Sequence, residues 1–140
     1  MKSTLKKIIT ITFIGFLAFR VFAPVRGTFT IESAQPVERF KKLIYAVGMV
    51  ETQLDTLAYN PLEEAAGYFQ IRPIRLMDYN IRTGSTYTMN DLFNYKISEK
   101  IFLYYASEIG PYNFERISKS WNGSGESTKI YWARVQTFLD

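Results

Sequence analysis

The sequence predicts a single, mostly α-helical domain of about six helices with at most a small β-hairpin. The chain has 140 residues, of which 47% are hydrophobic, and this is enough for one core. Along most of the chain, apolar residues recur at intervals of three and four, which is the period of a helix. The alternation typical of β-strands is nearly absent.

The first helix is expected to begin near Pro36, because proline is favoured in the first helical turn. Ser33 or Gln35 would cap it. Its apolar residues keep the helical spacing throughout; they are Val37, Phe40, Leu43, Ile44, Val47, Val50 and Leu54.

Loops and one short helix are expected in the middle of the chain. Residues 55–67 contain several helix breakers and form a loop, and the small hairpin would fall between residues 55 and 72. Pro73 is suited to open a brief helix that runs through Asp78. Residues 83–86, Thr-Gly-Ser-Thr, form another loop.

Three more helical elements follow. Residues 88–91, Thr-Met-Asn-Asp, match a capping box ahead of a short turn. A long helix then carries apolar residues from Ile97 onward and stops at Gly110-Pro111. Asn113 can cap the next helix, and residues 122–125, Asn-Gly-Ser-Gly, must be a turn. The last helix starts at Thr128, and the residues aligned on it are Tyr131, Val135 and Phe138.

The N-terminal residues have the pattern of an export signal. Three lysines precede a mostly apolar run over residues 8–19, which is short for a membrane span of about 20 residues. The run reaches Val25 if Arg20 extends to the membrane interface. We therefore expect residues 1–27 to be a signal peptide or an inner-membrane anchor, and residues 28–140 to be an exported domain, periplasmic or associated with the cell wall.

The composition excludes several kinds of site. There is no cysteine, which excludes disulfides, thiolate zinc sites, cysteine nucleophiles and lipoprotein anchoring. There is no histidine, which excludes Ser-His-Asp triads and histidine metal ligands. The carboxylates match no ligand spacing, so neither a metal nor another cofactor is expected. Acid–base chemistry would have to come from carboxylates, tyrosine or lysine.

The charge of the chain is concentrated in its first residues. Five of the 17 basic residues and none of the 13 acidic ones lie in residues 1–26, which leaves a net charge of −1 on the rest of the chain. A domain of this charge has no excess of cations for a phosphate backbone, so nucleic acid is not an expected partner.

Glu51 lies on the apolar side of the first predicted helix. It follows Val47 by four residues and precedes Leu54 by three, and such positions share a face. Burial disfavours a charged carboxylate and raises its pKa, as a general acid near neutral pH requires. The commoner explanation for such a residue is structural: Glu51 would reach water at the rim of the apolar face or pair with a basic residue.

Four short segments follow one another in a recognisable order, at residues 51–52, 66–73, 120–125 and 128–135. They read Glu-Thr, then Ala-Gly-Tyr-Phe-Gln-Ile-Arg-Pro, then Ser-Trp-Asn-Gly-Ser-Gly, then Thr-Lys-Ile-Tyr-Trp-Ala-Arg-Val. Together they resemble the lytic transglycosylase family, lysozyme-like enzymes that cleave bacterial peptidoglycan. The family pattern is Glu-Ser at a helix end, Gly-Leu-Met-Gln-Ile-x-Pro, Tyr-Asn-Ala-Gly, and a closing helix with Tyr and Val four residues apart.

The resemblance implies a lysozyme-like fold over roughly residues 38–139 and a role for each matching residue. Glu51 would be the catalytic acid and base. Thr52 stands where the family has Ser, and its hydroxyl could hydrogen-bond the Glu51 carboxyl. Tyr131 matches a tyrosine that lies near the catalytic carboxylate. The substrate-binding residues would be Thr52, Tyr68, Gln70, Asn122 and Tyr131.

These residues also have simpler structural explanations. Gln70 could satisfy backbone groups in a partly buried loop, and Asn122 could serve the φ > 0 conformation found at helix C-termini. Tyr131 lies on an apolar face, where core packing is the commoner role. Tyr68 replaces a leucine of the family pattern and keeps that position apolar.

The resemblance further implies a reaction on the glycan strands of peptidoglycan. The bond cleaved would be the β-1,4 bond between N-acetylmuramic acid and N-acetylglucosamine. Glu51 would protonate the glycosidic oxygen, and then accept a proton from the C6 hydroxyl of the sugar as that oxygen attacks C1. The product would be 1,6-anhydro-N-acetylmuramic acid, and no second carboxylate would be needed.

Three other functions remain open. A muramidase hydrolase would need a second carboxylate, for which Asp55, Glu63 and Glu64 are candidates, although a solvated loop explains the last two more simply. A non-catalytic peptidoglycan-binding or assembly protein with a degenerate lysozyme-like fold would account for Thr52 and the altered Asn122 turn. A membrane-anchored structural protein would explain the N-terminal run but not the ordered segments.

Overall fold

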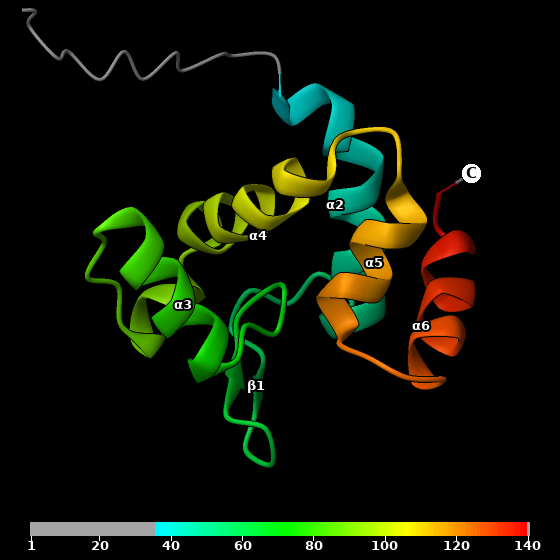
Figure 1. Ribbon diagram of the computed structural model, residues 1–140. Coiled ribbons are helices and arrows are strands. Elements are labelled where there is room, and N and C mark those ends of the chain that lie inside the picture. The colour runs from blue at the N-terminus through cyan, green and yellow to red at the C-terminus, as the bar shows by residue number, and fades with distance from the viewer. Residues whose placement is uncertain (1–35, 140) are drawn as a thin grey trace, which may run out of the picture. The chain divides into compact units, whose positions relative to one another are not determined.

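The computed structural model describes residues 36–139, with side chains from Arg39 onward. These residues form five α-helices, a short 3-10 helix and a two-stranded antiparallel sheet (Figure 1). In chain order the elements are α2 (Pro36–Thr52), β1 (Tyr59–Asn60), β2 (Ala65–Ala66), α3 (Pro73–Thr83), η1 (Met89–Phe93), α4 (Tyr95–Ile109), α5 (Phe114–Asn122) and α6 (Ser127–Gln136). The predicted mostly α-helical fold, with a small hairpin between residues 55 and 72, is confirmed.

The expected signal or anchor, residues 1–27, and the candidate caps Ser33 and Gln35 lie outside the described residues. None of the helices within residues 36–139 combines the length and the apolar character that a membrane crossing requires.

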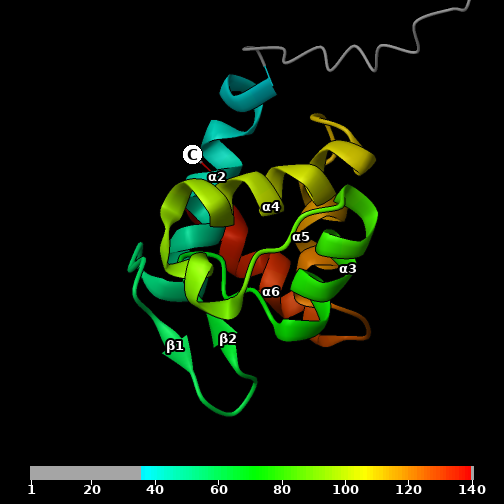
Figure 2. The same cartoon turned by 90° about the vertical axis from the view of Figure 1, so that its left-hand side faces the viewer.

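Four helices enclose the hydrophobic core. Both α2 and α5 pack against α4 and against α6. Figure 2 shows α4 in front of α6, with the hairpin of β1 and β2 at the lower end of the view. The large side chains that are completely buried come from all parts of the described chain; they are Leu43, Val47, Phe69, Ile71, Tyr79, Leu92, Ile101, Phe102 and Val135.

Gly67 makes the turn out of the hairpin possible. The two strands pair with Tyr59 opposite Ala66, and the chain then turns at Gly67 with a φ of 74°. A Cβ atom at Gly67 would overlap the backbone carbonyl oxygen of Leu92. Only glycine combines this left-handed conformation with so close an approach of two backbone segments.

Phe69 anchors the segment that follows this turn. Its ring is completely buried and stacks on Phe102, with the ring centroids 4.5 Å apart. The indole N–H of Trp121 donates a 3.1 Å hydrogen bond to the carbonyl oxygen of Phe69. Aromatic contacts of this kind stabilise a core beyond the area that they bury. The segment that carries Gln70 is therefore held against α4 and α5.

The capping signals are confirmed. The backbone N–H of Thr88 donates to the Asp91 carboxylate over 2.7 Å, which is half of the capping box predicted for η1. Asn113 caps α5, and its side chain accepts a 3.0 Å hydrogen bond from the backbone N–H of Arg116. α4 ends before Gly110, as predicted.

The end of α2 was predicted incorrectly. The helix ends at Thr52, whereas the apolar spacing continues to Leu54. Gln53 and Leu54 have φ values of 54° and 72°, which lie in the left-handed region and end the helix. The N–H of Leu54 donates to the carbonyl of Gly48 over 3.2 Å, as in common helix C-terminal motifs. Leu54 is 37% exposed and is not part of the apolar face of α2.

α3 is longer than predicted, since it continues past Asp78 to Thr83. Tyr79 is buried on this additional turn, and Arg82 pairs with Asp78 over 2.9 Å, one turn apart on the helix. Both contacts stabilise helical residues that have no strong local signal. Gly84, whose φ is 68°, caps the helix, so the loop predicted for residues 83–86 begins one residue later than expected.

The last helix begins and ends close to its predicted limits. It starts at Ser127, one residue before Thr128, whose hydroxyl donates to the carbonyl of Gly125 over 2.7 Å. It ends at Gln136, so Phe138 lies beyond the helix instead of on it. Phe138 still packs, half-buried, against the core.

Candidate active site

Glu51 lies at the C-terminal end of α2 and lines a cleft of about 210 Å³. Its side chain is half-buried, and within residues 39–139 it forms no ion pair. The structural explanation by an ion pair therefore does not hold. The other residues that line the cleft are Glu63, Gln70, Arg72, Ile74, Arg75, Trp121, Asn122 and Gly123.

Tyr131 holds the Glu51 carboxyl from α6. Its hydroxyl donates a 2.7 Å hydrogen bond to Oε1 of Glu51. The tyrosine is only 5% exposed, and burial and the nearby carboxylate raise the pKa of its hydroxyl, so that it stays a donor. Because α2 packs directly on α6, two segments 80 residues apart in sequence fix this pair.

The pKa of Glu51 is raised to about 7. Burial is the main cause, since a desolvated carboxylate is less stable than a neutral carboxyl. The hydrogen bond from Tyr131 acts in the other direction, as do the positive charges of Arg134 and Arg72. Near neutral pH, both the acid and the base form of Glu51 are therefore populated. The apolar position of this glutamate predicts the direction of the shift.

Arg134 joins α6 to the end of α2 a second time. Its guanidinium donates a 3.1 Å hydrogen bond to the carbonyl oxygen of Val50. Carbonyls in the last turn of a helix have no partner within the helix, so this bond satisfies one of them and fixes the backbone next to Glu51. Arg134 follows Tyr131 by three residues on α6, a spacing that places both on one side of the helix.

Of the three candidate second carboxylates, only Glu63 lines the cleft. It forms a bidentate ion pair with Arg72, with N–O distances of 3.0 and 3.1 Å. Asp55 lies beyond the end of α2, and its carboxylate accepts a hydrogen bond from the N–H of Leu57 over 2.8 Å. Glu64 is exposed and does not line the cleft.

Gln70 lines the cleft and also stabilises the loop that contains it. Its backbone has a φ of 48°, and its side-chain amide donates to the carbonyls of Gly67 and Ala58 over 3.1 and 3.3 Å. Gln70 therefore satisfies backbone groups of its loop, as the structural explanation predicts, and it also lines the cleft.

Asn122 is the last residue of α5 and lines the same cleft. The structural explanation for it was wrong, because Asn122 has no positive φ. Gly123 adopts that conformation instead, with a φ of 134°, so the predicted turn begins one residue later. The asparagine side chain remains half-buried at the wall of the cleft.

Thr52 and Tyr68 do not line the cleft. The resemblance suggested a hydrogen bond from the hydroxyl of Thr52 to the Glu51 carboxyl, and this bond is not formed. The hydroxyl donates instead to the backbone carbonyls of Tyr68 and Gly48, over 3.2 and 3.3 Å. Tyr68 is buried, and its ring lies edge-on to Tyr95 with centroids 5.0 Å apart. Both residues stabilise the packing between the end of α2 and the loop after the hairpin, outside the cleft.

Gly48 is a supporting residue that the sequence analysis missed. A Cβ atom at this position would overlap the ring of Tyr68. A glycine inside a helix lowers the stability of the helix by about 1 kcal/mol relative to alanine. A glycine in the middle of a predicted helix was therefore the sequence signal that another group packs closely at this position. The glycine lets Tyr68 pack directly against the helix that carries Glu51.

The cleft thus combines one carboxyl of near-neutral pKa with amide side chains and an exposed ion pair. Such a carboxyl can donate a proton to a bond that lies in the cleft and accept one afterwards. Within the described residues, no group of three or more acidic side chains could hold a metal ion. No protein-family model matches the chain, and neither a curated protein nor a solved structure is significantly similar to it.

Proposed function

We propose that this protein is a peptidoglycan lytic transglycosylase, which cleaves the β-1,4 bond between N-acetylmuramic acid and N-acetylglucosamine. The observation that carries the proposal is the state of Glu51. Its pKa is raised to about 7, it lines a cleft, and it is held by Tyr131. The order of the four sequence segments supports the same reaction and the same substrate class.

In the first step Glu51 acts as the acid. Tyr131 donates to Oε1, so the proton of the neutral carboxyl lies on Oε2. This proton passes to the glycosidic oxygen as the bond from that oxygen to C1 breaks, and positive charge develops at C1. The acetamido group of the substrate can assist at this stage. The resulting carboxylate is stabilised by Tyr131 and by the charges of Arg134 and Arg72.

In the second step the Glu51 carboxylate acts as the base. It accepts the proton of the C6 hydroxyl while the C6 oxygen attacks C1 and closes the 1,6-anhydro ring. Glu51 is protonated again at the end, and no water is consumed. One carboxyl with a pKa near the working pH serves both steps, because the two forms are then similarly populated.

A hydrolase is the second candidate, because Glu63 lines the same cleft as Glu51. A hydrolase would need Glu63 to activate a water molecule on the other side of the sugar. The ion pair with Arg72 argues against this role, since it engages both carboxylate oxygens of Glu63.

A non-catalytic wall-binding protein would require the cleft but not the buried carboxyl. Keeping Glu51 in an environment that raises its pKa lowers the stability of the folded protein as the pH rises from 4.5 to 7, and binding gains nothing from that cost. The proposed substrate lies outside the inner membrane, which agrees with the export signal expected in residues 1–27.

The test is mass spectrometry of purified peptidoglycan digested with the full chain, beside Glu51→Gln. We expect 1,6-anhydro products from the wild type and none from the variant. Products that carry a reducing end would instead indicate a hydrolase. Absence of any product, with binding to the wall retained, would favour the non-catalytic protein.

A further inference from the structure

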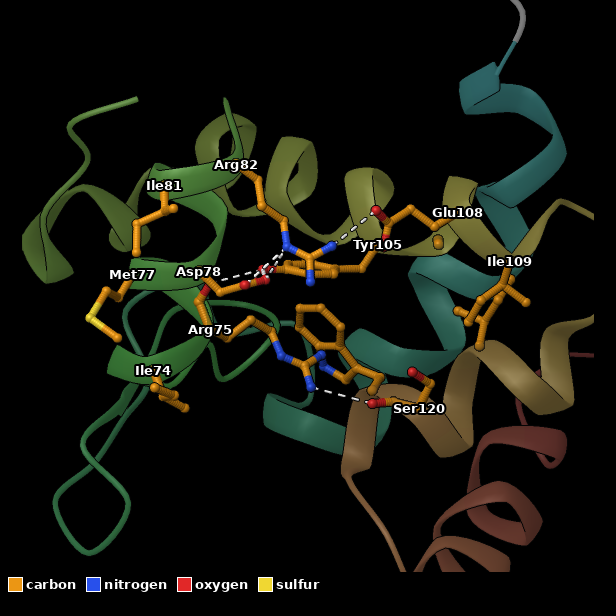
Figure 3. Close-up of a pocket in the computed structure, with 13 residues that line it drawn as sticks. Ile74, Arg75, Met77, Asp78, Ile81, Arg82, Tyr105, Glu108, Ile109 and Ser120 are labelled. Carbon is orange, nitrogen blue, oxygen red and sulfur yellow. Dashed lines mark hydrogen bonds and ion pairs between the residues drawn. The ribbon is translucent and has the colours of Figure 1, made fainter. Parts of the chain in front are cut away.

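A second pocket, of about 540 Å³, opens beside the Glu51 cleft between α3, α4 and α5 (Figure 3). Ile74, Arg75 and Trp121 line both the pocket and the cleft. The two spaces are therefore neighbours across a shared wall, and a ligand bound in the cleft can extend a side branch into the pocket.

Arg75 is the central polar group of this wall. Its guanidinium lies over the indole of Trp121, 4.1 Å from the ring centroid, and donates to the carbonyl of Ser120 over 3.3 Å. Figure 3 shows Arg75 pointing from α3 towards α5, with the bond to Ser120 dashed. Burial lowers the pKa of Arg75, although a guanidinium remains charged at neutral pH.

The other two arginines at these walls have acidic partners. Arg72 pairs with Glu63, and Arg82 pairs with Asp78 and Glu108 over 2.9 and 3.3 Å. Arg75 has no such ion pair among the residues that the structure describes. The charges of Glu51 and Asp78 act on Arg75 from a distance, but neither carboxylate forms an ion pair with it. A partly buried guanidinium in this position can form a direct ion pair with a bound carboxylate.

Beside the ion pairs of Arg82 with Asp78 and Glu108, the pocket is lined mainly by apolar side chains. Ile74, Met77 and Ile81 are 65%, 53% and 74% exposed and recur on α3 at the spacing of one helix face. Ile109 and Ile117 line the opposite side. This lining suits a ligand that carries short apolar side chains as well as carboxylates.

The proposed reaction adds a further constraint. Positive charge develops at C1 of the sugar, and a guanidinium near Glu51 that has no ion-pair partner would oppose it. The sugar rings of the strand are neutral. The acidic groups of peptidoglycan belong to the branch on the lactyl ether of muramic acid, either the peptide or, where the peptide is missing, the lactyl carboxylate itself.

We infer that the pocket binds the peptide branch of muramic acid, with Arg75 paired to one of its carboxylates. The inference rests on the proposed function and specifies its substrate: strands that still carry peptides are preferred over bare strands. The size and apolar lining of the pocket favour the peptide over the lactyl carboxylate alone.

Binding can be measured without cleavage in the full chain carrying Glu51→Gln, by tryptophan fluorescence or calorimetry. Three soluble oligosaccharides separate the sources of the carboxylate: one with peptides, one stripped to lactyl carboxylates, and a chitin oligomer without any branch. We expect the peptide-bearing ligand to bind roughly tenfold more tightly than either of the others, as a buried charged hydrogen bond allows. Adding Arg75→Gln should abolish this preference, and Arg75→Lys should restore part of it.

Two further variants guard against indirect effects. Arg116→Gln, on the exposed surface of α5 and outside both spaces, should leave the preference intact. Ile81→Glu changes a highly exposed side chain, so it should fold normally and weaken only the peptide-bearing ligand. This second variant tests the pocket even if Arg75→Gln is unstable.

Equal affinity for the three ligands, or a preference that survives Arg75→Gln, would overturn the inference. Tightest binding of the stripped strand, lost with Arg75→Gln, would assign Arg75 to the lactyl carboxylate and reject the peptide. Failure of the proposed function would appear elsewhere, as absence of products from wild-type digests, because none of these binding measurements requires cleavage.

Discussion

Tyr131 and Glu51 form a 2.7 Å hydrogen bond that joins α6 to the end of α2. The bond has two consequences for the carboxyl. It restrains the position of Oε1, and it favours the charged form against the larger effect of burial. The pKa of about 7 is the balance of these opposing influences.

The first prediction concerns the stability of Glu51→Gln. Glu51 has a pKa of about 7 when folded, above its ordinary 4.5, so the folded protein keeps a proton that the unfolded chain releases. The free energy of unfolding of the wild type therefore falls as the pH rises from 4.5 to 7 and is constant above. Glutamine keeps the acceptor for Tyr131 without the charge, so the variant should be more stable by about 3 kcal/mol at pH 8 and by less than about 1 kcal/mol at pH 5.

Urea unfolding at the two pH values measures this difference. Glu64→Gln, at an exposed position outside the cleft, is the matched control and should change stability little at either pH. An equal gain for Glu51→Gln at both pH values would contradict the raised pKa.

The second prediction concerns Tyr131→Phe. The substitution removes a hydrogen bond to the charged carboxylate, worth about 1.5–3 kcal/mol, so the pKa of Glu51 should rise by roughly 1–2 units. In the wild type, kcat/KM should decline above about pH 7 as the acid form is lost. In the variant this decline should move to higher pH, and the maximal rate should fall about tenfold because the carboxyl is less well positioned.

A pH–rate profile of peptidoglycan cleavage tests the shift. Tyr59→Phe removes a hydroxyl from an exposed tyrosine on β1 and should leave the profile unchanged. If Tyr131→Phe lowered the rate without moving the alkaline limb, the hydroxyl would have no part in setting the pKa.

The third prediction separates the two enzymatic mechanisms through Glu63. In a transglycosylase Glu63 is no nucleophile or base, so Glu63→Gln should retain anhydro products with at most a severalfold change in rate. Its negative charge helps to raise the pKa of Glu51, so the alkaline limb should move slightly to lower pH in the variant. Mass spectrometry of the products tests whether anhydro products are retained, and a pH–rate profile tests the shift of the alkaline limb. Loss of activity by several orders of magnitude, with reducing-end products from the wild type, would identify Glu63 as the second carboxylate of a hydrolase.

The fourth prediction concerns the packing behind the site. Gly48→Ala places a methyl group where the Tyr68 ring lies, so it should destabilise the fold by about 1–3 kcal/mol. Tyr68→Leu removes the overlap, and in that background the alanine should cost far less or stabilise α2 through its better helix propensity. A double-mutant cycle of thermal or urea unfolding measures the coupling, and additive effects would show that the two residues do not clash.

Most of the fold could be predicted because its signals are local. Asn113 and the Thr88–Asp91 capping box bond backbone groups within one turn, and their geometry depends on few other residues. The error at the end of α3 arose where a distant contact decides. α3 extends past Asp78 because Tyr79 is buried against the rest of the domain, and no pattern within α3 specifies that contact.

The candidate site could be predicted only in part, since Thr52 and Tyr68 do not line the cleft. Gln70, Asn122 and Glu51 line one cleft, as their order in the chain suggested. The hydroxyl of Thr52 bonds the backbone of Tyr68 instead of the catalytic candidate, because the loop after the hairpin passes within its reach. Sequence spacing does not specify which of two acceptors lies nearer to a side chain.

The sequence alone determined the helical class, most helix starts, and the placement of a carboxyl on an apolar helix face. These properties follow from periodicity and capping, which act over a few residues. Tertiary structure decided that Tyr131 bonds Glu51, that the pKa of this carboxyl is about 7, and that Arg75 lines a pocket and forms no ion pair within residues 39–139. Solvation and charge pairing depend on all neighbours in space, and most of those neighbours lie far away along the chain.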